Sequence, residues 1–279
     1  MDINYNSPRE LRGFLETHHL AMSKQFGQNF LVNKDARAKL LEALELKPGT
    51  DVWEIGPGLG AMTQGLLERG ASVHAFEIDS GFCRILRSLF PDKQRFFLYE
   101  GDVFKQYHSA PRAHLLIGNL PYSIAAALLA EFIEQEYYFD RIVVTVQKEV
   151  ADRMIARPCS HTYSAFSVLC ASVYCVKRIA AVPARLFYPV PHVDSQGVQL
   201  DLRADFPVYP RLFRPLVRGL FSVRRKTIKN SLRMFLNTQC ITGDAGIMLK
   251  QCAIVENTRA EQLSCEDFLR LAHCISSFI

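Results

Sequence analysis

Residues 51–61 read DVWEIGPGLGA, a sequence that predicts a buried strand, a glycine-rich turn and the start of a helix. The turn holds three glycines, which allow the backbone to turn tightly and to pass close to a ligand. Gly56, Gly58 and Ala61 also fit the G-x-G-x-x-G/A fingerprint of dinucleotide-binding folds. The turn therefore predicts a nucleotide-type site at the end of the strand, and by itself it leaves a nicotinamide oxidoreductase as an alternative.

Strands and helices alternate outward from this turn. The predicted strands are short, continuous apolar runs, as expected when helices cover both faces of a sheet. Such an alternating order implies a parallel, doubly wound sheet, so the expected fold class is α/β. The predicted strands are residues 51–55, 72–77, 95–99, 114–118 and 141–147. The predicted helices are residues 34–46, 61–68, 80–89, 123–135 and 148–155.

The pattern changes in the second half of the chain. An apolar, helix-like segment at 164–174 is followed by predicted strands at 176–182 and 193–202, which could form an antiparallel edge. From Pro207 onward the strand signal disappears and only helical periodicity remains. We therefore expect the sheet to end before this point and a purely helical region to follow it.

These shifts predict two domains. Pro207 and Pro210 bracket a linker, and residues 1–23 are polar and irregular, as is typical of a flexible arm. The expected division is residues 1–205 for the α/β domain, which includes the arm, and residues 206–279 for a small, all-helical domain.

Length and composition fit a soluble globular protein. A chain of 279 residues can bury a substantial core, and its 49% apolar and 22% charged residues are ordinary for this class. Acidic residues interrupt the amino-terminal region where a signal peptide would need an apolar segment. The longest apolar stretch, residues 124–130, is far too short to span a membrane. We expect a cytoplasmic protein without a membrane partner.

The eight cysteines indicate neither a metal site nor a disulfide framework. They are scattered, and no Cys-x-x-Cys pair supplies the tight spacing that metal ligands need. Disulfide frameworks are typical of short secreted chains, which this chain is not. We expect reduced, mostly buried thiols and no metal cofactor.

Basic residues are concentrated in the helical region. The net charge of +5 is mild, yet no acidic residue lies between Phe206 and Gly243, where eight arginines and lysines fall. A cationic face of this kind is typical of proteins that bind a phosphate backbone. The alternative is a solvated helix surface, which usually mixes both signs of charge. We favour a polyanion partner.

Carboxylates follow two further predicted strands. Glu77 closes the strand at 72–77, where a carboxylate can accept hydrogen bonds from both hydroxyls of a ribose. Asp102 follows the strand at 95–99, where an acceptor can form a hydrogen bond with the amino group of an adenine. The pair suits an adenosine-bearing ligand that needs no pyrophosphate cradle. Alternatively, each carboxylate caps the helix that follows it.

The sequence Asn119-Leu120-Pro121-Tyr122 comes at the end of another buried strand. The carboxamide of Asn119 and the neighbouring carbonyls of Leu120 or Pro121 can accept the hydrogens of a base's exocyclic amine. Tyr122 can stack on the same base, and Phe187, in a proline-rich loop, is a second candidate platform. Ordinary core packing is the alternative for Phe187. This constellation predicts chemistry on a nucleobase amine.

Together, EIGPGLG, Glu77, Gly-Asp102-Val and NLPY resemble the class I S-adenosylmethionine-dependent methyltransferases that act on adenine N6. Further segments are similar to the ribosomal RNA adenine dimethyltransferase family, and the resemblance covers about residues 20–275 in the same order. These segments are Lys24-x-x-Gly27-Gln28-Asn29-Phe30-Leu31, Gln147-Lys148-Glu149-Val150-Ala151-x-Arg153, Phe187-x-Pro-x-Pro-x-Val-Asp194-Ser195 and Arg224-Arg225-Lys226-Thr227-x-x-Asn230.

The resemblance implies a Rossmann-like sheet, S-adenosylmethionine as cofactor and roles for particular residues. The cofactor-binding residues would be Gln28, Asn29, Leu31, Gly56, Gly58, Glu77, Ile78, Asp102, Val103 and Asn119. The catalytic residues would be Asn119, Leu120, Pro121 and Tyr122, and the substrate-binding residues Tyr122, Phe187, Arg224, Arg225 and Lys226. One departure is the segment Ser123–Ala127, where the family commonly has small polar residues and a proline.

The small-subunit branch of this family is the most similar. It implies dimethylation of two adjacent adenosines in a hairpin loop near the 3′ end of 16S rRNA, in an immature 30S particle. A monomer would suffice for this reaction. Two alternatives are an erythromycin-resistance-type enzyme acting on large-subunit rRNA and a mainly non-catalytic assembly or transcription factor on the same fold.

Overall fold

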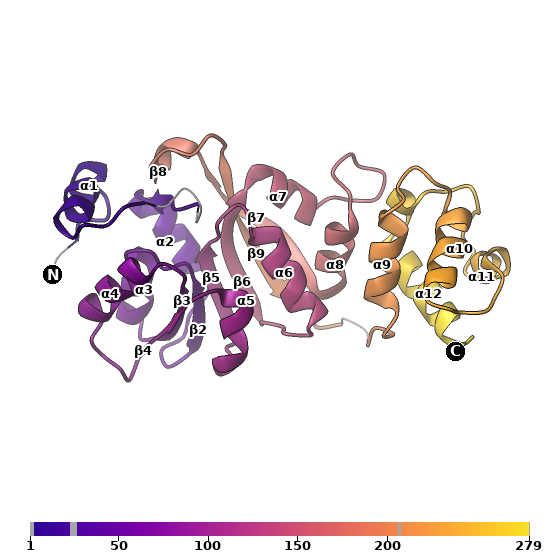
Figure 1. The fold of residues 1–279 in the computed structure, drawn as a ribbon, viewed down its shortest axis with the longest axis horizontal. Helices are drawn as coiled ribbons and strands as arrows, with labels where there is room; N and C mark the ends of the chain where they lie inside the picture. Colours follow the sequence, from indigo (N-terminus) through magenta and orange to yellow (C-terminus); the bar gives the residue numbers. More distant parts are fainter. Residues whose placement is uncertain (1–2, 23–26, 206–207, 279) are drawn as a thin grey trace. The chain divides into compact units, whose positions relative to one another are not determined.

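The computed structural model describes residues 3–22, 27–205 and 208–278 (Figure 1). Its helices are α1 Pro8–Thr17, α2 Lys34–Ala43, α3 Ala61–Glu68, α4 Ser80–Leu89, α5 Val103–Gln106, α6 Ala125–Glu134, α7 Lys148–Met154, α8 Ala165–Val173, α9 Phe213–Phe221, α10 Ile228–Thr238, α11 Ala245–Gln251 and α12 Cys265–Ser276. Its strands are β1 Phe30–Leu31, β2 Asp51–Ile55, β3 Ser72–Glu77, β4 Phe96–Glu100, β5 Leu115–Asn119, β6 Arg141–Gln147, β7 Tyr174–Val182, β8 Phe187–Tyr188 and β9 Ser195–Leu202.

The central sheet is doubly wound. Among the described residues it has seven strands in the order β4-β3-β2-β5-β6-β9-β7. Strands β2 to β6 are parallel to one another, whereas β9 runs antiparallel to β6. Strand order reverses between β2 and β5, whose register pairs Ile55 with Gly118. In open α/β sheets, ligands bind beyond the carboxyl ends of the strands at such a reversal.

Different cores cover the two faces of the sheet, which explains the continuous apolar runs of the strands. On one face, side chains of α2, α3 and α4 pack on residues such as Val52 and Ile117. On the other face, the fully buried Trp53 packs on aromatic rings that include Phe132 and Phe139, at centroid distances of 6.1 and 5.3 Å. Large ring contacts of this kind dominate core energetics.

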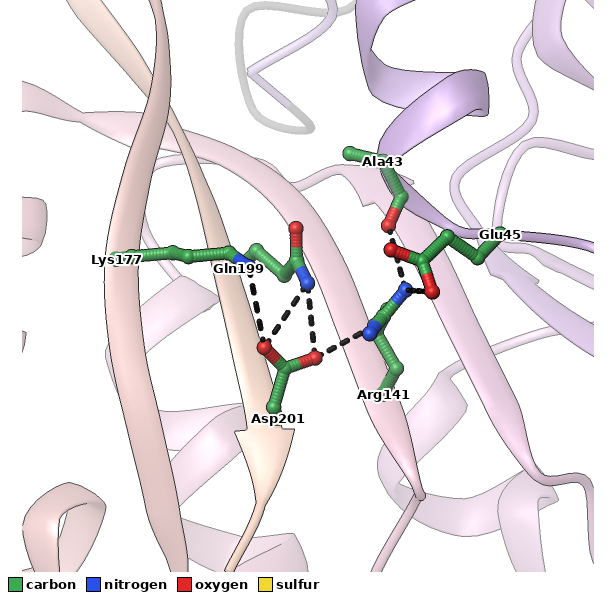
Figure 2. A network of polar contacts seen from close by, with 6 residues as sticks. All are labelled: Ala43, Glu45, Arg141, Lys177, Gln199 and Asp201. Carbon is green, nitrogen blue, oxygen red and sulfur yellow. Dashed lines mark hydrogen bonds and ion pairs between the residues drawn. The ribbon is translucent and has the colours of Figure 1, made fainter.

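A polar network ties α2 to two strands of the sheet (Figure 2). The Arg141 guanidinium on β6 forms ion pairs with Glu45 at 2.8 Å and with Asp201 on β9 at 2.5 Å, and it donates to the Ala43 carbonyl. Gln199 donates to both oxygens of Asp201. Hydrogen bonds from Arg141 and Gln199 hold the pKa of Asp201 below its usual value, although burial opposes them. The network links the antiparallel edge to the helix layer.

Most predicted elements are confirmed, several of them to the residue. Strands 51–55, 72–77 and 141–147 and helices 61–68 and 80–89 have the predicted bounds. The helix predicted at 34–46 ends earlier, at Ala43. The strands predicted at 176–182 and 193–202 are present as β7 and β9, and the antiparallel pairing of β9 with β6 confirms the predicted change of direction at this end of the sheet. Lys24 and Pro207 lie outside the described residues.

The irregular backbone predicted for residues 1–23 is wrong for residues 8–17, which form α1. Ser7 caps this helix by accepting a hydrogen bond from the Glu10 N–H, and Pro8 occupies the first turn, where a proline is tolerated. Leu11 and Leu15 on its inner face are buried against the α/β core, beside Leu59 and Phe82. The helix has only a short apolar stripe among many polar residues, which is why the composition predicted an irregular, flexible segment.

The chain divides into two compact units, and the division is more complex than the expected cut at 205/206. The first unit comprises Met1–Phe132, Tyr137–Ala151 and Val176–Leu202. The second comprises Ile133–Glu136, Asp152–Cys175 and Arg203–Ile279, so that α8 joins the helical unit. The described part of the second unit packs around Phe213, Leu220 and Phe268. Tyr163 belongs to the same core and donates a 2.8 Å hydrogen bond to the Leu263 carbonyl.

The cysteines are less buried than expected. Cys83, Cys170 and Cys252 are buried, whereas Cys159, Cys175 and Cys240 are exposed. All eight are free thiols in the structure. No helix in the described ranges has the length and apolar character required to cross a membrane.

Replacement of Gly118 by alanine should destabilise the first unit. An added Cβ would lie 2.7 Å from the Ile55 carbonyl oxygen, which belongs to the neighbouring strand and cannot move away cheaply. We expect a loss of ~1–3 kcal/mol in the free energy of unfolding, measured by urea denaturation. Gly13→Ala is the matched control, because a Cβ on the exposed Gly13 of α1 meets nothing within 4 Å. Equal stability of the two variants would contradict the close approach of β2 and β5.

Candidate active site

A cavity of about 370 Å³ lies at the carboxyl ends of the parallel strands. Because β4, β3, β2 and β5 are parallel neighbours, the segments that follow them meet at one edge of the sheet. The cavity is lined by residues from all four of these segments and from residues 27–31. The sequence had predicted site residues in each of these places, and the fold brings them together.

The glycine turn shapes one wall of the cavity. Gly56 has φ of +67°, a backbone conformation that residues with a side chain rarely adopt. A Cβ built on Gly56 would meet no protein atom within 4 Å, so a side chain there would project into open space. Gly56 and Gly58 both line the cavity. The absence of side chains thus leaves a cradle that a ligand can fill.

Glu77 lies at the end of β3 and is only 5% exposed. Its carboxylate accepts hydrogen bonds from the backbone N–H groups of Gly58, at 3.0 Å, and Asp79, at 2.9 Å. Burial raises the pKa of Glu77 to about 7, although these two hydrogen bonds oppose the shift. The helix after β3 is capped by Asp79 instead, so Glu77 does not have the capping role that was its alternative.

Asp102 has the capping role that the sequence had left open. Its side chain accepts a 3.0 Å hydrogen bond from the Phe104 N–H and begins α5. It also lines the cavity, and its second carboxylate oxygen has no hydrogen-bond partner among the described residues. Ile78, which is 45% exposed, and the buried Val103 line the same region. An apolar slot edged by a carboxylate oxygen fits a flat base with an amino group.

Glu54 is a second buried carboxyl group at the cavity, and the sequence had not singled it out as a site residue. It is 1% exposed and accepts a 2.6 Å hydrogen bond from the Thr63 hydroxyl of α3. Burial raises its pKa to about 7, against the effect of the Thr63 hydrogen bond. In the sequence, Glu54 lies inside a predicted strand, as a core residue would. Only the adjacent glycine turn could have indicated that Glu54 lies at the site.

The NLPY segment presents acceptors to the cavity. The Asn119 carboxamide donates from Nδ2 to the Asn29 carbonyl at 2.7 Å, which fixes the orientation of the amide and leaves Oδ1 as an acceptor. The Pro121 carbonyl already accepts from the N–H groups of Ile124 and Ala125, both at 3.1 Å. Of the two carbonyls proposed from the sequence, that of Leu120 is therefore the better acceptor for a substrate.

Tyr122 is anchored at the far end of its ring. Its hydroxyl lies 2.7 Å from the hydroxyl of Ser195, which is 3% exposed at the start of β9. Burial raises the pKa of Tyr122. Tyr122, the stacking platform predicted from the sequence, also lines the cavity. In the sequence, Ser195 was noted only as the last residue of the segment at 187–195, and this contact was not predicted.

Residues 27–31 form another wall. Gln28 donates to Asp79 at 3.0 Å, and Asn29 donates to the Gly27 carbonyl at 3.0 Å. Leu31 is buried in β1, which pairs with β8. Gln28, Asn29 and Leu31, which the resemblance assigns to the cofactor, all line the cavity.

Phe187 does not lie among the residues that line the cavity. It pairs with Leu31 across β1 and β8, is only 2% exposed, and packs in the core against α2. No ring face is accessible for stacking on a base. Phe187 is therefore a core residue, as in the alternative stated above, because the β1–β8 pairing turns its side chain inward.

Three predicted substrate-binding residues belong to the second unit. Arg224, Arg225 and Lys226 are exposed in the turn between α9 and α10. Arg224 donates to the Tyr163 carbonyl, and Lys226 approaches the Met234 sulfur at 3.3 Å. No described acidic residue forms an ion pair with any of the three.

Acidic residues from other segments neutralise part of the basic stretch. Arg214 pairs with Glu136 at 3.0 Å, Arg218 pairs with Glu134, and Lys229 pairs with Glu256 at 2.8 Å. These partners are distant in sequence, so the charge count along residues 206–243 overstates the cationic surface. The exposed turn at 224–226 keeps its charge.

Two further cavity residues come from α1 and the segment before it. Tyr5 and Leu11 line the cavity, and the Tyr5 hydroxyl donates to the Leu59 carbonyl of the glycine turn at 2.9 Å. Arg37 of α2 also lines it. The predicted flexible arm concealed the first two, and the pattern of a helix face gave no signal for the third.

This sheet order and this site define a class I, S-adenosylmethionine-dependent methyltransferase fold of the Rossmann-like α/β type. A family model described as ribosomal RNA adenine dimethylase matches residues 20–277. The chain belongs to this family, and the nicotinamide alternative is set aside.

Relatives cover nearly the whole chain. The ribosomal RNA small subunit methyltransferase A of Treponema denticola is 44% identical over 98% of this chain and 96% of its own length. The protein of the same name from Treponema pallidum strain Nichols is 42% identical over 99% of both chains. A dimethyladenosine transferase structure from Plasmodium falciparum is 26% identical, covers 86% of this chain and 94% of its own, and has a TM-score of 0.73. The 23S rRNA methyltransferase ErmE, at 23% identity and a TM-score of 0.65, covers 88% of this chain and 99% of its own and shares the fold.

The buried carboxyl groups should make stability depend on pH in a defined direction. The pKa of Glu54 in the folded protein is about 7, above its ordinary 4.5, so the folded state binds this proton more tightly than the unfolded state. The stabilisation is therefore complete below pH 4.5 and is lost as the pH rises through 7.

Glu54→Gln removes this contribution. We expect the difference in the free energy of unfolding between the original protein and the variant to fall by on the order of 2 kcal/mol from pH 5 to pH 8, measured by urea denaturation. Glu42→Gln, at an exposed glutamate of α2 for which the structure describes no ion pair, is the control. A difference for Glu54→Gln that does not change with pH would contradict the raised pKa.

Proposed function

We propose that this protein dimethylates N6 of two adjacent adenosines in a hairpin loop near the 3′ end of 16S rRNA, with S-adenosylmethionine as methyl donor. The observation that carries the proposal is the shared cavity. It combines an oriented carboxamide at Asn119 with the glycine turn and with the carboxylates of Glu77 and Asp102. These are an amine-binding group and an adenosine-binding group at one edge of the sheet.

The cavity residues fit the proposed cofactor. The cradle at Gly56 accepts a group that passes close to the backbone, and Glu77 would accept hydrogen bonds from the ribose hydroxyls. Asp102 would accept one from the adenine amino group, between Ile78 and Val103. Gly58, Gln28, Asn29 and Leu31 would enclose the remainder. When bound, the cofactor supplies an electrophilic methyl group on a sulfonium.

The chain's own residues prepare the target amine. The N6 lone pair of adenine is delocalised into the ring, so the amine is a poor nucleophile. Asn119 Oδ1 and the Leu120 carbonyl would accept its hydrogens and favour a more pyramidal nitrogen whose lone pair points toward the donor. Orientation and preorganised dipoles of this kind lower the barrier to transfer. The product proton is acidic and can leave to water, so no general base is required.

A base must leave its stack to reach such a cavity. Tyr122 is the proposed platform, because aromatic rings are the usual stacking surface for splayed RNA bases. Its hydroxyl contact with Ser195 holds the ring in place. Pro121 stiffens the backbone between the amine acceptors and this ring.

The small-subunit substrate is supported by the names of relatives that match the whole chain. Proteins called ribosomal RNA small subunit methyltransferase A are 36–44% identical to it. The exposed cations at 224–226 would contact the RNA backbone. We propose that the protein acts as a cytoplasmic monomer on an immature 30S particle, without a metal or a membrane partner.

Asn119→Ala should abolish methyl transfer and leave cofactor binding nearly intact. The variant loses the acceptor that orients the amine, whereas Glu77, Asp102 and the glycine turn remain. We expect at least a ~100-fold loss in transfer of labelled methyl to undermodified small subunits, consistent with the loss of one preorganised polar group. Affinity for S-adenosylhomocysteine should change by only a few fold, measured by calorimetry.

Asn237→Ala, at an exposed asparagine of α10, is the matched control and should behave as the original protein. Near-normal transfer by Asn119→Ala would refute the assigned role. Mapping of the modified nucleotide in the original protein's product tests the substrate. A label in large-subunit RNA, or no transfer at all, would favour the erythromycin-resistance-type or non-catalytic alternative.

Arg225→Gln should weaken RNA binding more than Lys229→Gln. Both variants remove one positive charge, but Lys229 is already neutralised by Glu256, whereas Arg225 has no described acidic partner. We expect the slope of log affinity against log salt to fall by about one for Arg225→Gln and to stay nearly unchanged for the control. Filter binding to small-subunit RNA over a salt series measures both. Equal slopes for the two variants would exclude the turn as a contact.

A further inference from the structure

Arg37 is a buried cation at the cavity with only neutral partners. Its side chain is on α2, is 8% exposed and lines the cavity. Nη1 donates to the Leu31 carbonyl at 2.5 Å and to the Tyr5 carbonyl at 3.5 Å, and Nη2 donates to the Asn6 side-chain oxygen at 2.6 Å. None of the described carboxylates forms an ion pair with it. Arginine is almost never this buried without an anionic partner.

Two N–H donors of the Arg37 guanidinium are unused by the described residues. The three hydrogen bonds use Nη1 and one N–H of Nη2, so the Nε–H and the second Nη2 N–H have no partner among the described residues. The Nε and Nη2 edge of a guanidinium matches a carboxylate, which it can bind with two parallel hydrogen bonds. The N–H donors that are left are therefore suited to an anion such as a carboxylate.

The charges around the cavity point to the same ligand group. The described residues that line it include three carboxyl groups, Glu54, Glu77 and Asp102, and one cation, Arg37. Carboxylates suit the hydroxyls, the amino groups and the positive charges of an adenosyl amino acid. The carboxylate of such a ligand is best matched by the cation, Arg37.

We propose that Arg37 binds the α-carboxylate of the methyl donor and of its demethylated product. This inference rests on the proposed function, since it assigns one more group of the proposed cofactor. Arg37 donates to the Leu31 carbonyl, in the wall formed by residues 27–31, and contacts Tyr5, whose hydroxyl holds the Leu59 carbonyl of the glycine turn. The guanidinium is therefore tied to two walls of the cavity.

A clamp is the rival role for Arg37. Its bonds to Tyr5 and Asn6 join the segment before α1 to α2, and this role alone would make any substitution weaken the cavity as a whole. The two roles differ in one respect. A carboxylate partner predicts that the loss of affinity depends on the ligand's carboxylate, whereas a clamp predicts an equal loss for all ligands.

Two ligands separate these roles by calorimetry. One is S-adenosylhomocysteine, and the other is S-adenosyl-3-thiopropylamine, the same molecule without its carboxylate. The original protein should bind the first about 10- to 100-fold more tightly, as expected for charge-assisted hydrogen bonds. This comparison needs no variant, and equal affinity for the two ligands would overturn the inference.

Arg37→Gln should weaken S-adenosylhomocysteine binding by about 10- to 100-fold and leave binding of the carboxylate-free ligand within about three-fold. Arg37→Lys, which keeps the charge but not the fork, should lie in between. Lys39→Gln, at an exposed lysine of α2, is the control for net charge, and Asn6→Ala loosens the clamp without removing the cation. Neither control should alter the ratio of the two affinities.

Equal losses for both ligands in Arg37→Gln would overturn the inference and leave the proposed function intact. A selective loss in Asn6→Ala, equal to that of Arg37→Gln, would assign the effect to the clamp and would also overturn it. If the original protein bound neither ligand, the proposed cofactor itself would be wrong. That outcome is distinct from the other two.

Discussion

The parallel pairing of β2 with β5 is the constraint on which the site depends. It places Ile55 beside Gly118, so that the glycine turn after one strand and the NLPY segment after the other begin at the same level of the sheet. The approach is so close that a methyl group on Gly118 would touch the Ile55 carbonyl. Backbone hydrogen bonds between the two strands thus fix the glycine turn and the NLPY segment relative to each other.

Burial of carboxyl groups gives the site its electrostatic character. Glu54 and Glu77 lie almost out of contact with solvent, and burial raises the pKa of each to about 7. Both are held by donors, a threonine hydroxyl for Glu54 and backbone N–H groups for Glu77. The arrangement costs stability at neutral pH and keeps acceptors ready in a region of low dielectric, where their hydrogen bonds to a ligand are strongest.

Local patterns predicted most of the fold because strands buried on both faces are continuous apolar runs. The glycine turn, Glu77, Asp102 and NLPY were also readable, since each follows such a strand. What the sequence concealed depends on pairing between distant segments. Phe187 is turned into the core by its pairing with β1. The acidic residues that form ion pairs with the basic helices, Glu134, Glu136 and Glu256, are distant from them in sequence.

Arg37 and α1 were hidden for a related reason. A cation on a helix face resembles a solvated residue until the neighbouring segment covers it. The apolar stripe of α1 is only Leu11 and Leu15 on the buried side, within a polar sequence. Both features depend on the packing of Tyr5 and α1 against the glycine turn and the core, which no local pattern encodes.

The hydroxyl contact between Tyr122 and Ser195 has a consequence for the entropy of substrate capture. A phenol whose hydroxyl is hydrogen-bonded at its far end has less torsional freedom before any ligand binds. Ordering of this side chain is then completed during folding, so the proposed stacking of a base on Tyr122 would add little new entropic cost. In the proposed reaction, a second adenosine presented after the first would meet the same ring in the same orientation.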